Sequence, residues 1–221
     1  MPTKTQPAFV TFTGADDASL CKSMSELSAK YPIEWGILVD RDKAGRPLFP
    51  LPQHIDRFRQ LGVRLCAHIC GSVATDIARG AVPTLNLGGF SRIQINHGRE
   101  GASAAVVSAV QRFANLHTVR GVLQCRDLSF PTEYAGVDWL YDVSFGEGVR
   151  PTSFPQIEQD LPFCGISGGI GPDNVETTLD DLVQVAPGTA FWIDMESGVR
   201  TNGVFDLGRC KDVCERVYGK R

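Results

Sequence analysis

Residues 163–194 read FCGISGGIGPDNVETTLDDLVQVAPGTAFWID and contain the unit that decides the fold. A short β-rich run at 163–167 is followed by two adjacent glycines, and apolar residues then recur at helical spacing over 175–183. Pro172 suits the first turn of that helix. A second β-rich run follows at 190–194. The stretch therefore predicts a strand, a helix and another strand, the unit from which parallel sheets are built.

The same alternation extends along the whole chain. Eight β-rich runs begin 18 to 29 residues apart, at 8–13, 34–39, 63–69, 92–96, 120–124, 138–143, 163–167 and 190–194. Most are apolar at successive positions, which is typical of parallel strands covered on both faces. Amphipathic segments lie between them. The 18-residue interval after the fifth run has no room for a long helix, so we expect that helix to be short or irregular.

Eight strands alternating with helices predict a compact (β/α)₈ barrel of the α/β class, the TIM-barrel architecture. A doubly wound open sheet is the competing fold, and it requires a glycine-rich fingerprint after the first strand. That loop reads Thr13-Gly14-Ala15-Asp16-Asp17, with one glycine and two acids that would repel a pyrophosphate. The barrel is therefore favoured, as a single domain over residues 1–221.

Composition and charge narrow the possible partners. The chain has 221 residues, 22 Lys and Arg against 25 Asp and Glu, and a net charge of −3. A broad basic surface is not expected, which argues against nucleic acid as a partner. Uninterrupted apolar runs stay well below the roughly 18 residues that span a bilayer, so no membrane association is predicted either.

The seven cysteines are an odd number with wide spacing, which is a poor disulfide framework and suits a reducing compartment. Because the start of the chain also lacks the apolar stretch of a signal peptide, we predict a cytoplasmic protein. Cys66 and Cys70, like Cys210 and Cys214, are four residues apart, which is not a CxxC spacing. We read them as small buried residues and predict no metal and no cofactor.

Two glycine-containing loops follow the seventh and eighth strands. Gly168 and Gly169 form one, and Ser197 and Gly198 lie in the other. In a (β/α)₈ barrel the loops after strands seven and eight commonly hold a phosphate, which backbone N–H groups and a helix N-terminus can bind. The sequence therefore predicts a phosphate site on these four residues.

Four segments resemble the phosphoribosylanthranilate isomerase family, an Amadori-type isomerase family of tryptophan biosynthesis. The run GISGGIGPDNV is similar to that family's strand-seven phosphate loop, and WIDMESGVR to its strand-eight segment. RIQINHG and LYDVSFGEG resemble the strand-four and strand-six segments. The resemblance implies a barrel enzyme that isomerises a small phosphorylated aminosugar, acting as a monomer or homodimer.

The resemblance also implies catalytic residues. In the family an Asp after strand six protonates the sugar ring oxygen, and Asp142 matches it. A Cys at the end of strand one removes the proton from C2′, but Thr13 stands at that position. Arg46 is the candidate for the family's anthranilate-binding arginine, with Arg41 as its alternative, and His97 lies in the matching strand-four segment as a candidate substrate contact.

A Thr hydroxyl is a much weaker base than a thiolate, so another group is expected to replace the missing Cys. Asp127, after strand five, is the most chemical choice because it would face Asp142 as a second carboxylate. Other candidates follow the remaining strands: Asp16, Asp17, His68, Cys70, His97 and Cys125. Three functions stay open: the family's own isomerisation, an enzyme acting on another sugar phosphate, and a catalytically silent phosphosugar-binding protein.

Overall fold

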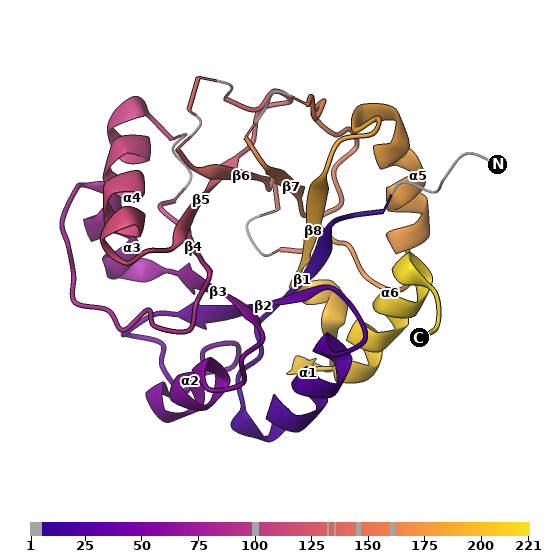
Figure 1. Ribbon diagram of the computed structural model, residues 1–221, viewed down its shortest axis with the longest axis horizontal. Coiled ribbons are helices and arrows are strands. Elements are labelled where there is room, and N and C mark those ends of the chain that lie inside the picture. The colour runs from indigo at the N-terminus through magenta and orange to yellow at the C-terminus, as the bar shows by residue number, and fades with distance from the viewer. Residues whose placement is uncertain (1–5, 99–101, 132, 135, 145–146, 160–161) are drawn as a thin grey trace.

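The computed structural model describes residues 6–98, 102–131, 133–134, 136–144, 147–159 and 162–221. Eight parallel strands pair in sequence order, and β8 pairs with β1 to close the ring (Figure 1). The predicted (β/α)₈ barrel is thus confirmed. The strands are β1 (Phe9–Thr13), β2 (Ile33–Val39), β3 (Arg64–Ile69), β4 (Arg92–Ile95), β5 (Arg120–Cys125), β6 (Asp138–Tyr141), β7 (Cys164–Ile166) and β8 (Phe191–Met195).

The described residues form six α-helices, which surround the barrel unevenly. They cover the left, lower and right sides of the ring in Figure 1, and loops occupy the upper side. In the described part of the β5–β6 and β6–β7 connections there is no helix, so the expectation of a short or irregular fifth helix is confirmed. The helices are α1 (Cys21–Ser28), α2 (Pro52–Arg59), α3 (Gly71–Ala78), α4 (Ala104–Leu116), α5 (Val175–Val185) and α6 (Leu207–Tyr218).

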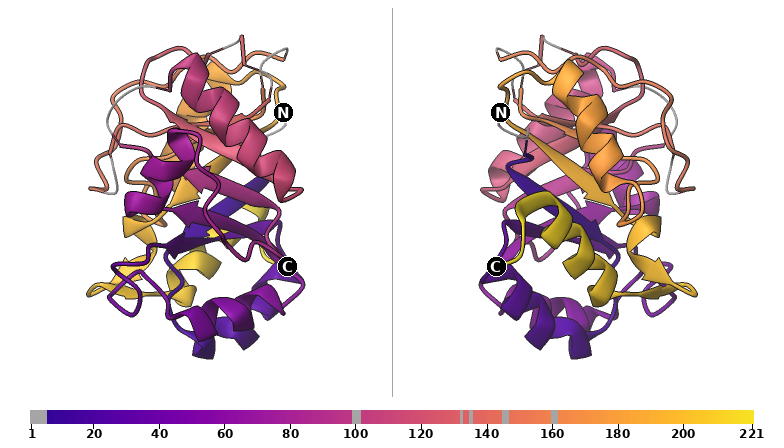
Figure 2. Two further views of the ribbon diagram at one scale, coloured as in Figure 1. Left: turned by 90° about the vertical axis from the view of Figure 1, so that its left-hand side faces the viewer. Right: turned by 90° about the vertical axis from the view of Figure 1, so that its right-hand side faces the viewer.

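Short elements complete the chain at two places. A 3₁₀ turn, η1 (Ala18–Leu20), precedes α1, and a second, η2 (Ser197–Val199), follows β8. The two-stranded antiparallel pair of β9 (Arg200–Thr201) and β10 (Val204–Phe205) then leads into α6. Figure 2 shows the barrel from two sides, with the helices packed along the outside of the strands. No helix of the described residues is long and apolar enough to cross a membrane.

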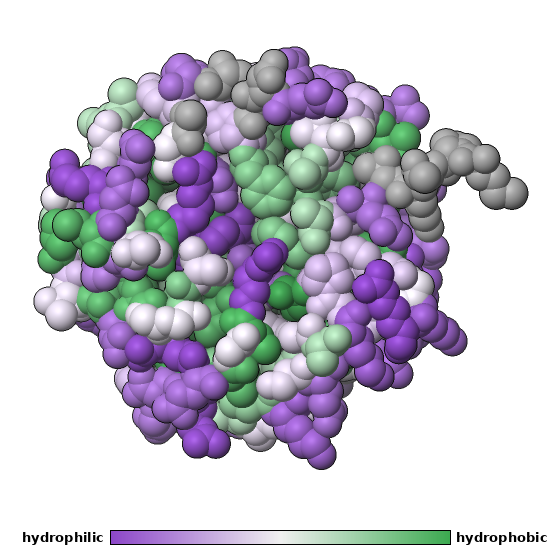
Figure 3. Space-filling view, in the orientation of Figure 1, coloured by the Kyte–Doolittle hydropathy of each residue, from purple (hydrophilic) through white to green (hydrophobic). Residues whose placement is uncertain are grey.

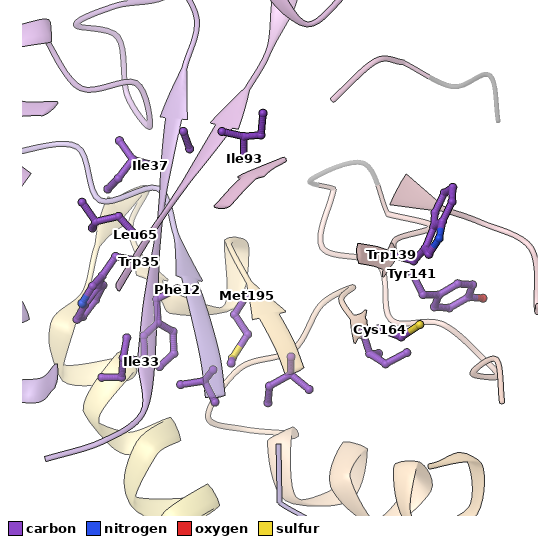
Figure 4. Packing of buried hydrophobic residues seen from close by; sticks show 14 of the residues in the cluster. Phe12, Ile33, Trp35, Ile37, Leu65, Ile93, Trp139, Tyr141, Cys164 and Met195 are labelled. Atoms are coloured by element: carbon purple, nitrogen blue, oxygen red, sulfur yellow. The ribbon is translucent and has the colours of Figure 1, made fainter. Parts of the chain in front are cut away.

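The main hydrophobic core lies between the strands and the helices. Phe12, Ile33 and Trp35 gather on one side of the barrel and Trp139 and Cys164 on another (Figure 4). Because side chains alternate along a strand, every second residue packs outward into this core and its neighbours point into the barrel. Hydrophilic and hydrophobic residues are intermixed on the face shown in Figure 3.

The inward-facing residues include a second, smaller buried cluster. Trp192 packs there with Phe9, Val122 and Leu140 rather than in the main core. These residues come from β1, β5, β6 and β8, so they meet across the barrel interior. Gly165 on β7 makes room for them, because a Cβ there would strike the Trp192 ring.

Much of the interior is polar, although the β-rich runs suggested apolar strands on both faces. Arg92 on β4 donates to both carboxylate oxygens of Glu34 on β2, at 3.0 and 2.7 Å. It also donates to Asp138 on β6 at 3.3 Å, and Arg120 donates to the other Asp138 oxygen at 2.7 Å. The Arg92 guanidinium stacks 4.1 Å from the Trp192 ring. This ion-pair network fills the amino-terminal end of the barrel.

Candidate active site

The candidate site is a cavity of about 410 Å³ at the carboxyl-terminal ends of the strands. This end of a (β/α)₈ barrel is where active sites are built, because the βα loops converge there. Residues at or just after the ends of all eight strands line the cavity: Thr13, Leu38, His68, Cys70, Asn96, Gln124, Asp142, Ser167, Gly168, Gly169, Glu196 and Ser197, together with Asp194 inside β8.

Thr13 lies where the family resemblance predicts a catalytic Cys. Its Oγ1 donates a hydrogen bond to Oδ1 of Asp194 at 2.8 Å, and both residues are buried. Gly36 on the neighbouring β2 leaves the space for this side chain, since a Cβ at Gly36 would collide with the Thr13 hydroxyl. The hydroxyl thus donates to a buried carboxyl group, and Thr13 is among the residues that line the cavity.

Two carboxyl groups at the end of β8 have raised pKa values. Burial raises the pKa of Asp194 to about 8. The hydrogen bond from Thr13 lowers this pKa, whereas the nearby carboxylates of Glu196, Glu34 and Asp142 raise it further. Burial also raises the pKa of Glu196 to about 7, with Arg200 lowering it and Asp142 raising it. Both side chains can therefore exchange protons near neutral pH, which is the range that general acid–base catalysis requires.

Asp142 follows β6 and is held in a fixed orientation. Its Oδ2 accepts a hydrogen bond from Nε2 of Gln124 at 2.8 Å. Its Oδ1 accepts from both the backbone N–H and the hydroxyl of Ser144, each at 2.9 Å. The carboxylate lines the cavity and is 8% exposed, so its position is suited to proton transfer to a bound molecule.

The loops after β6, β7 and β8 meet with no space between their backbones. A Cβ on Gly169, which has φ +57°, would strike the Gly148 carbonyl, and a Cβ on Gly198 would strike the Ile170 carbonyl. Gly168, Gly169 and Ser197 line the cavity. Within the described residues, the N–H groups of Gly168 and Gly169 donate to no backbone carbonyl. The N–H groups of Gly168 and Gly169 are thus available to an anion in the cavity, whereas Gly198, the fourth residue of the predicted phosphate site, is not among the lining residues.

The loop after β2 supplies a different cation from the one expected. Arg46 is exposed and does not line the cavity, whereas Lys43 does, together with Leu48 and Phe49. The Lys43 ammonium lies 5.0 Å from the centroid of the Phe49 ring and 3.7 Å from the Asp40 carboxylate. The loop therefore presents an apolar wall with one ammonium group.

The two other predicted site residues lie away from the cavity wall. Asp127 is exposed in the loop after β5 and is not among the lining residues. The ring of His97 contacts the Ile95 carbonyl through Nδ1 at 3.2 Å, while Asn96 and Gly98 on either side of it line the cavity. Asp127 therefore does not share the cavity that Asp142 lines.

His68 and Cys70, two of the alternative bases named from the sequence, line the cavity, but their pKa values make both poor bases at neutral pH. Burial, with Arg92 adding to it, lowers the pKa of His68 to about 3. Burial raises the pKa of Cys70 to about 11, although Asn96 donates to its sulfur at 3.2 Å. At neutral pH both groups are uncharged, and His68 is a weak proton acceptor. The described residues contain no group of three or more His, Cys, Asp or Glu side chains placed to hold a metal ion.

The sequence analysis missed Asp194, Glu196 and Lys43 as site residues. A usable signal existed for the first two, since positions 194 and 196 are two residues apart at the end of a strand and therefore point to the same side. Lys43 lies in the twelve-residue connection between β2 and α2, residues 40–51, which has no periodicity, so the direction of its side chain could not be read from the sequence.

A closed (β/α)₈ barrel with orienting hydrogen bonds, carboxyl groups and glycine loops around one cavity defines a TIM-barrel protein with an enzyme-like site. A family model described as N-(5′-phosphoribosyl)anthranilate (PRA) isomerase matches residues 90–216. The chain therefore belongs to the PRA isomerase family, as its segments suggested. Thr13 and the loop after β2 lie outside the matched residues.

Solved structures agree with the fold. Monomers generated from the dimeric phosphoribosylanthranilate isomerase of Thermotoga maritima superpose with a TM-score of 0.60 at 15% identity, over 96% of this chain and all of that one. The Thermococcus kodakaraensis isomerase gives 0.58 at 14% identity, again over 96% and 100%. The Pyrococcus furiosus isomerase gives 0.55 at 14%, over 96% and 99%. No curated protein matches the chain.

Proposed function

We propose that this protein carries out an Amadori-type isomerisation of a phosphorylated aminoribose, with N-(5′-phosphoribosyl)anthranilate as the first substrate to test. One observation carries the proposal: Asp142, fixed by Gln124 and Ser144, lines the same cavity as Gly168 and Gly169. A phosphate on the glycine loops would hold the sugar within the cavity, and Asp142 would protonate the ring oxygen to open the sugar. This chemistry is a step of tryptophan biosynthesis.

The loop after β2 supports an aromatic acid as the other half of the substrate. Leu48 and Phe49 give an apolar wall for a ring, and Lys43 gives a positive charge for its carboxylate. In this proposal Lys43 takes the part that the sequence analysis gave to Arg46. Asp127 has no part in it, and His97 only supports its strand end.

The cell compartment proposed for this function is the cytoplasm. All seven cysteines are unbridged thiols, and such a number of thiols suits a reducing compartment.

A second candidate function is isomerisation of a different sugar phosphate. Thr13 favours it, because its hydroxyl is engaged with Asp194 and cannot act as the family's thiolate does. A binding protein without activity is the third possibility, and the cost of keeping Asp142, Asp194 and Glu196 around one cavity argues against it.

The deciding experiment is a fluorescence assay of the purified protein with N-(5′-phosphoribosyl)anthranilate, which loses its anthranilate fluorescence on isomerisation. We expect turnover in the wild type and a loss of about 10²–10⁴-fold in Asp142→Asn, the usual worth of a general acid. Silence of the wild type with ribose 5-phosphate still bound would overturn this substrate in favour of another phosphosugar. Absence of both would overturn the function as a whole.

A further inference from the structure

We propose that Glu196 is the general base of this reaction, and that the base has moved from β1 to β8. The inference rests on the proposed function and adds a residue to it. In the family resemblance the base is a thiol at the position of Thr13, and this chain has no thiol there. The geometry points to Glu196 because its carboxylate lines the same cavity from the adjacent strand.

Strand register places Glu196 level with Thr13. β1 and β8 pair in parallel with Phe12 opposite Met195, and these two side chains lie close together in the outer core (Figure 4). Thr13 and Glu196 each follow this last pair by one residue, and both line the cavity. Neighbouring strands are about 4.8 Å apart, so the longer Glu side chain reaches the region that a side chain at position 13 would serve.

Glu196 is available for proton transfer in a way that the other carboxyl groups are not. The Asp194 carboxyl accepts from Thr13 at 2.8 Å, and Asp142 accepts from Gln124 and Ser144. No hydrogen bond or ion pair holds the Glu196 carboxylate among the described residues. It can therefore approach a C–H bond without first breaking an internal contact.

The titratable groups around Glu196 come from four neighbouring segments. Arg200 from β9 favours its ionised form, and Asp142 after β6 opposes it. Asp194 on the same strand and Cys70 after β3 also feel its charge. Because Asp194 is more deeply buried and has the higher pKa, Glu196 ionises first as the pH rises. At pH 7 Glu196 is therefore partly ionised and can accept a proton, beside a largely protonated Asp194.

The proton transfer balances without a co-reactant. After the ring opens, the sugar is an iminium with a C1=N bond, and Glu196 removes the proton from C2. The C2–H electron pair becomes a C1=C2 bond, and the C1=N pair moves onto nitrogen and neutralises it. The resulting enolamine becomes the ketone when its 2-hydroxyl loses a proton and C1 gains one. The net change is an isomerisation, with no oxidant or reductant consumed.

The test compares Glu196→Gln with Glu196→Asp and with a surface control, Glu26→Gln on α1, whose side chain is 62% exposed. With N-(5′-phosphoribosyl)anthranilate, Glu196→Gln should lose about 10²–10⁴-fold in kcat. Its affinity for ribose 5-phosphate should stay within about threefold of wild type. Glu196→Asp should regain part of the rate, and Glu26→Gln should match the wild type. The acidic limb of the wild-type profile, near pH 7, should disappear in Glu196→Gln.

Two results would overturn the inference, and a third would overturn the proposed function instead. Wild-type turnover with an equal rate in Glu196→Gln would show that another residue is the base while leaving the proposed function intact. A wild type silent on this substrate would fail the proposed function instead. In that case ¹³C NMR of Glu-labelled protein still decides the role of Glu196. A Glu196 resonance that titrates near the ordinary value of about 4.3 would exclude it as a base at neutral pH, and one that titrates near 7 would retain it.

Discussion

The two ends of the barrel interior hold carboxylates in opposite ways. At the amino-terminal end, Glu34 and Asp138 are bound by the guanidinium of Arg92, and Asp138 also by Arg120. At the carboxyl-terminal end, Asp194 faces the hydroxyl of Thr13 rather than a cation. Glu196 lies beside it on the cavity wall.

The difference separates stability from chemistry. A buried carboxylate beside a guanidinium stays charged and fixes neighbouring strands, whereas one held away from cations gains a raised pKa and can exchange protons. Residues at the amino-terminal end of a (β/α)₈ barrel generally serve stability and those at the carboxyl-terminal end serve function. A single strand of this chain shows both roles, because β6 begins with the ion-paired Asp138 and is followed directly by Asp142 on the cavity wall.

The largest effect is expected at the amino-terminal end. Arg92→Met leaves Glu34 as a buried charge without its partner, which should lower the free energy of unfolding by about 3–5 kcal/mol. Urea unfolding at pH 7 measures this change. The control is the double variant Arg92→Met with Glu34→Gln, which removes the charge as well and should recover part of the loss. A loss below about 1 kcal/mol in the single variant would contradict the division between the two ends.

The next effect concerns Asp194 and the dependence of stability on pH. Its pKa is about 8 in the folded protein and about 3.9 when unfolded, so the folded state binds the proton more tightly. The stability from this group is complete below about pH 4 and is lost as the pH rises toward 8.

Asp194→Asn should therefore flatten the decline in stability between pH 5 and pH 8. Three pH units at 1.36 kcal/mol each limit the difference to about 4 kcal/mol. Thermal unfolding over that pH range measures it, with Asp173→Asn as the control because the Asp173 side chain is 84% exposed. If stability falls equally with pH in the wild type and in Asp194→Asn, Asp194 is not the group that binds the proton.

A smaller effect is expected from the loops that close the carboxyl-terminal end. Gly198→Ala places a methyl group against the Ile170 carbonyl and should separate the loops after β7 and β8. Affinity for ribose 5-phosphate should fall at least about tenfold, or 1.4 kcal/mol. Isothermal titration calorimetry measures this, with Gly188→Asn as the control. Gly188 has φ +69° and open space around it, so Asn can replace it. Equal affinities in both variants would place the phosphate elsewhere.

The sequence predicted the barrel because periodicity is a property of many residues at once. Each of the eight strands begins and ends within two residues of its predicted run. That the described residues between β5 and β6 form no helix agrees with the short interval in the sequence. The interior could not be predicted in the same way, because Arg92 meets Glu34 58 positions away, a pairing that only the closed ring creates. The same holds for the candidate site. Local motifs pointed to Asp142 and the glycine loops, which line the cavity. Asp127 and Arg46 lie in loops whose direction the sequence does not determine, and neither lines the cavity.

The smallest effect is expected at Thr13, and it tests whether the carboxyl-terminal end could ever have used a thiol. A Cys at position 13 would lie beside the Asp194 carboxyl that Thr13 now contacts at 2.8 Å, and level with Glu196. Burial and neighbouring carboxylates raise a thiol pKa, so little thiolate should form at pH 7. We therefore expect Thr13→Cys to change the isomerase rate by less than about tenfold, whereas restoring an activated thiolate base would be worth about 10²–10⁴-fold. Thr13→Ser, which keeps the hydroxyl, is the control and should match the wild type.

Rapid inactivation of Thr13→Cys by iodoacetamide at pH 7, with a large rate gain, would show that the site still activates a thiol. The proton would then be removed from β1 after all, and the contrast between the two ends would rest on phosphate binding and on Asp142 alone.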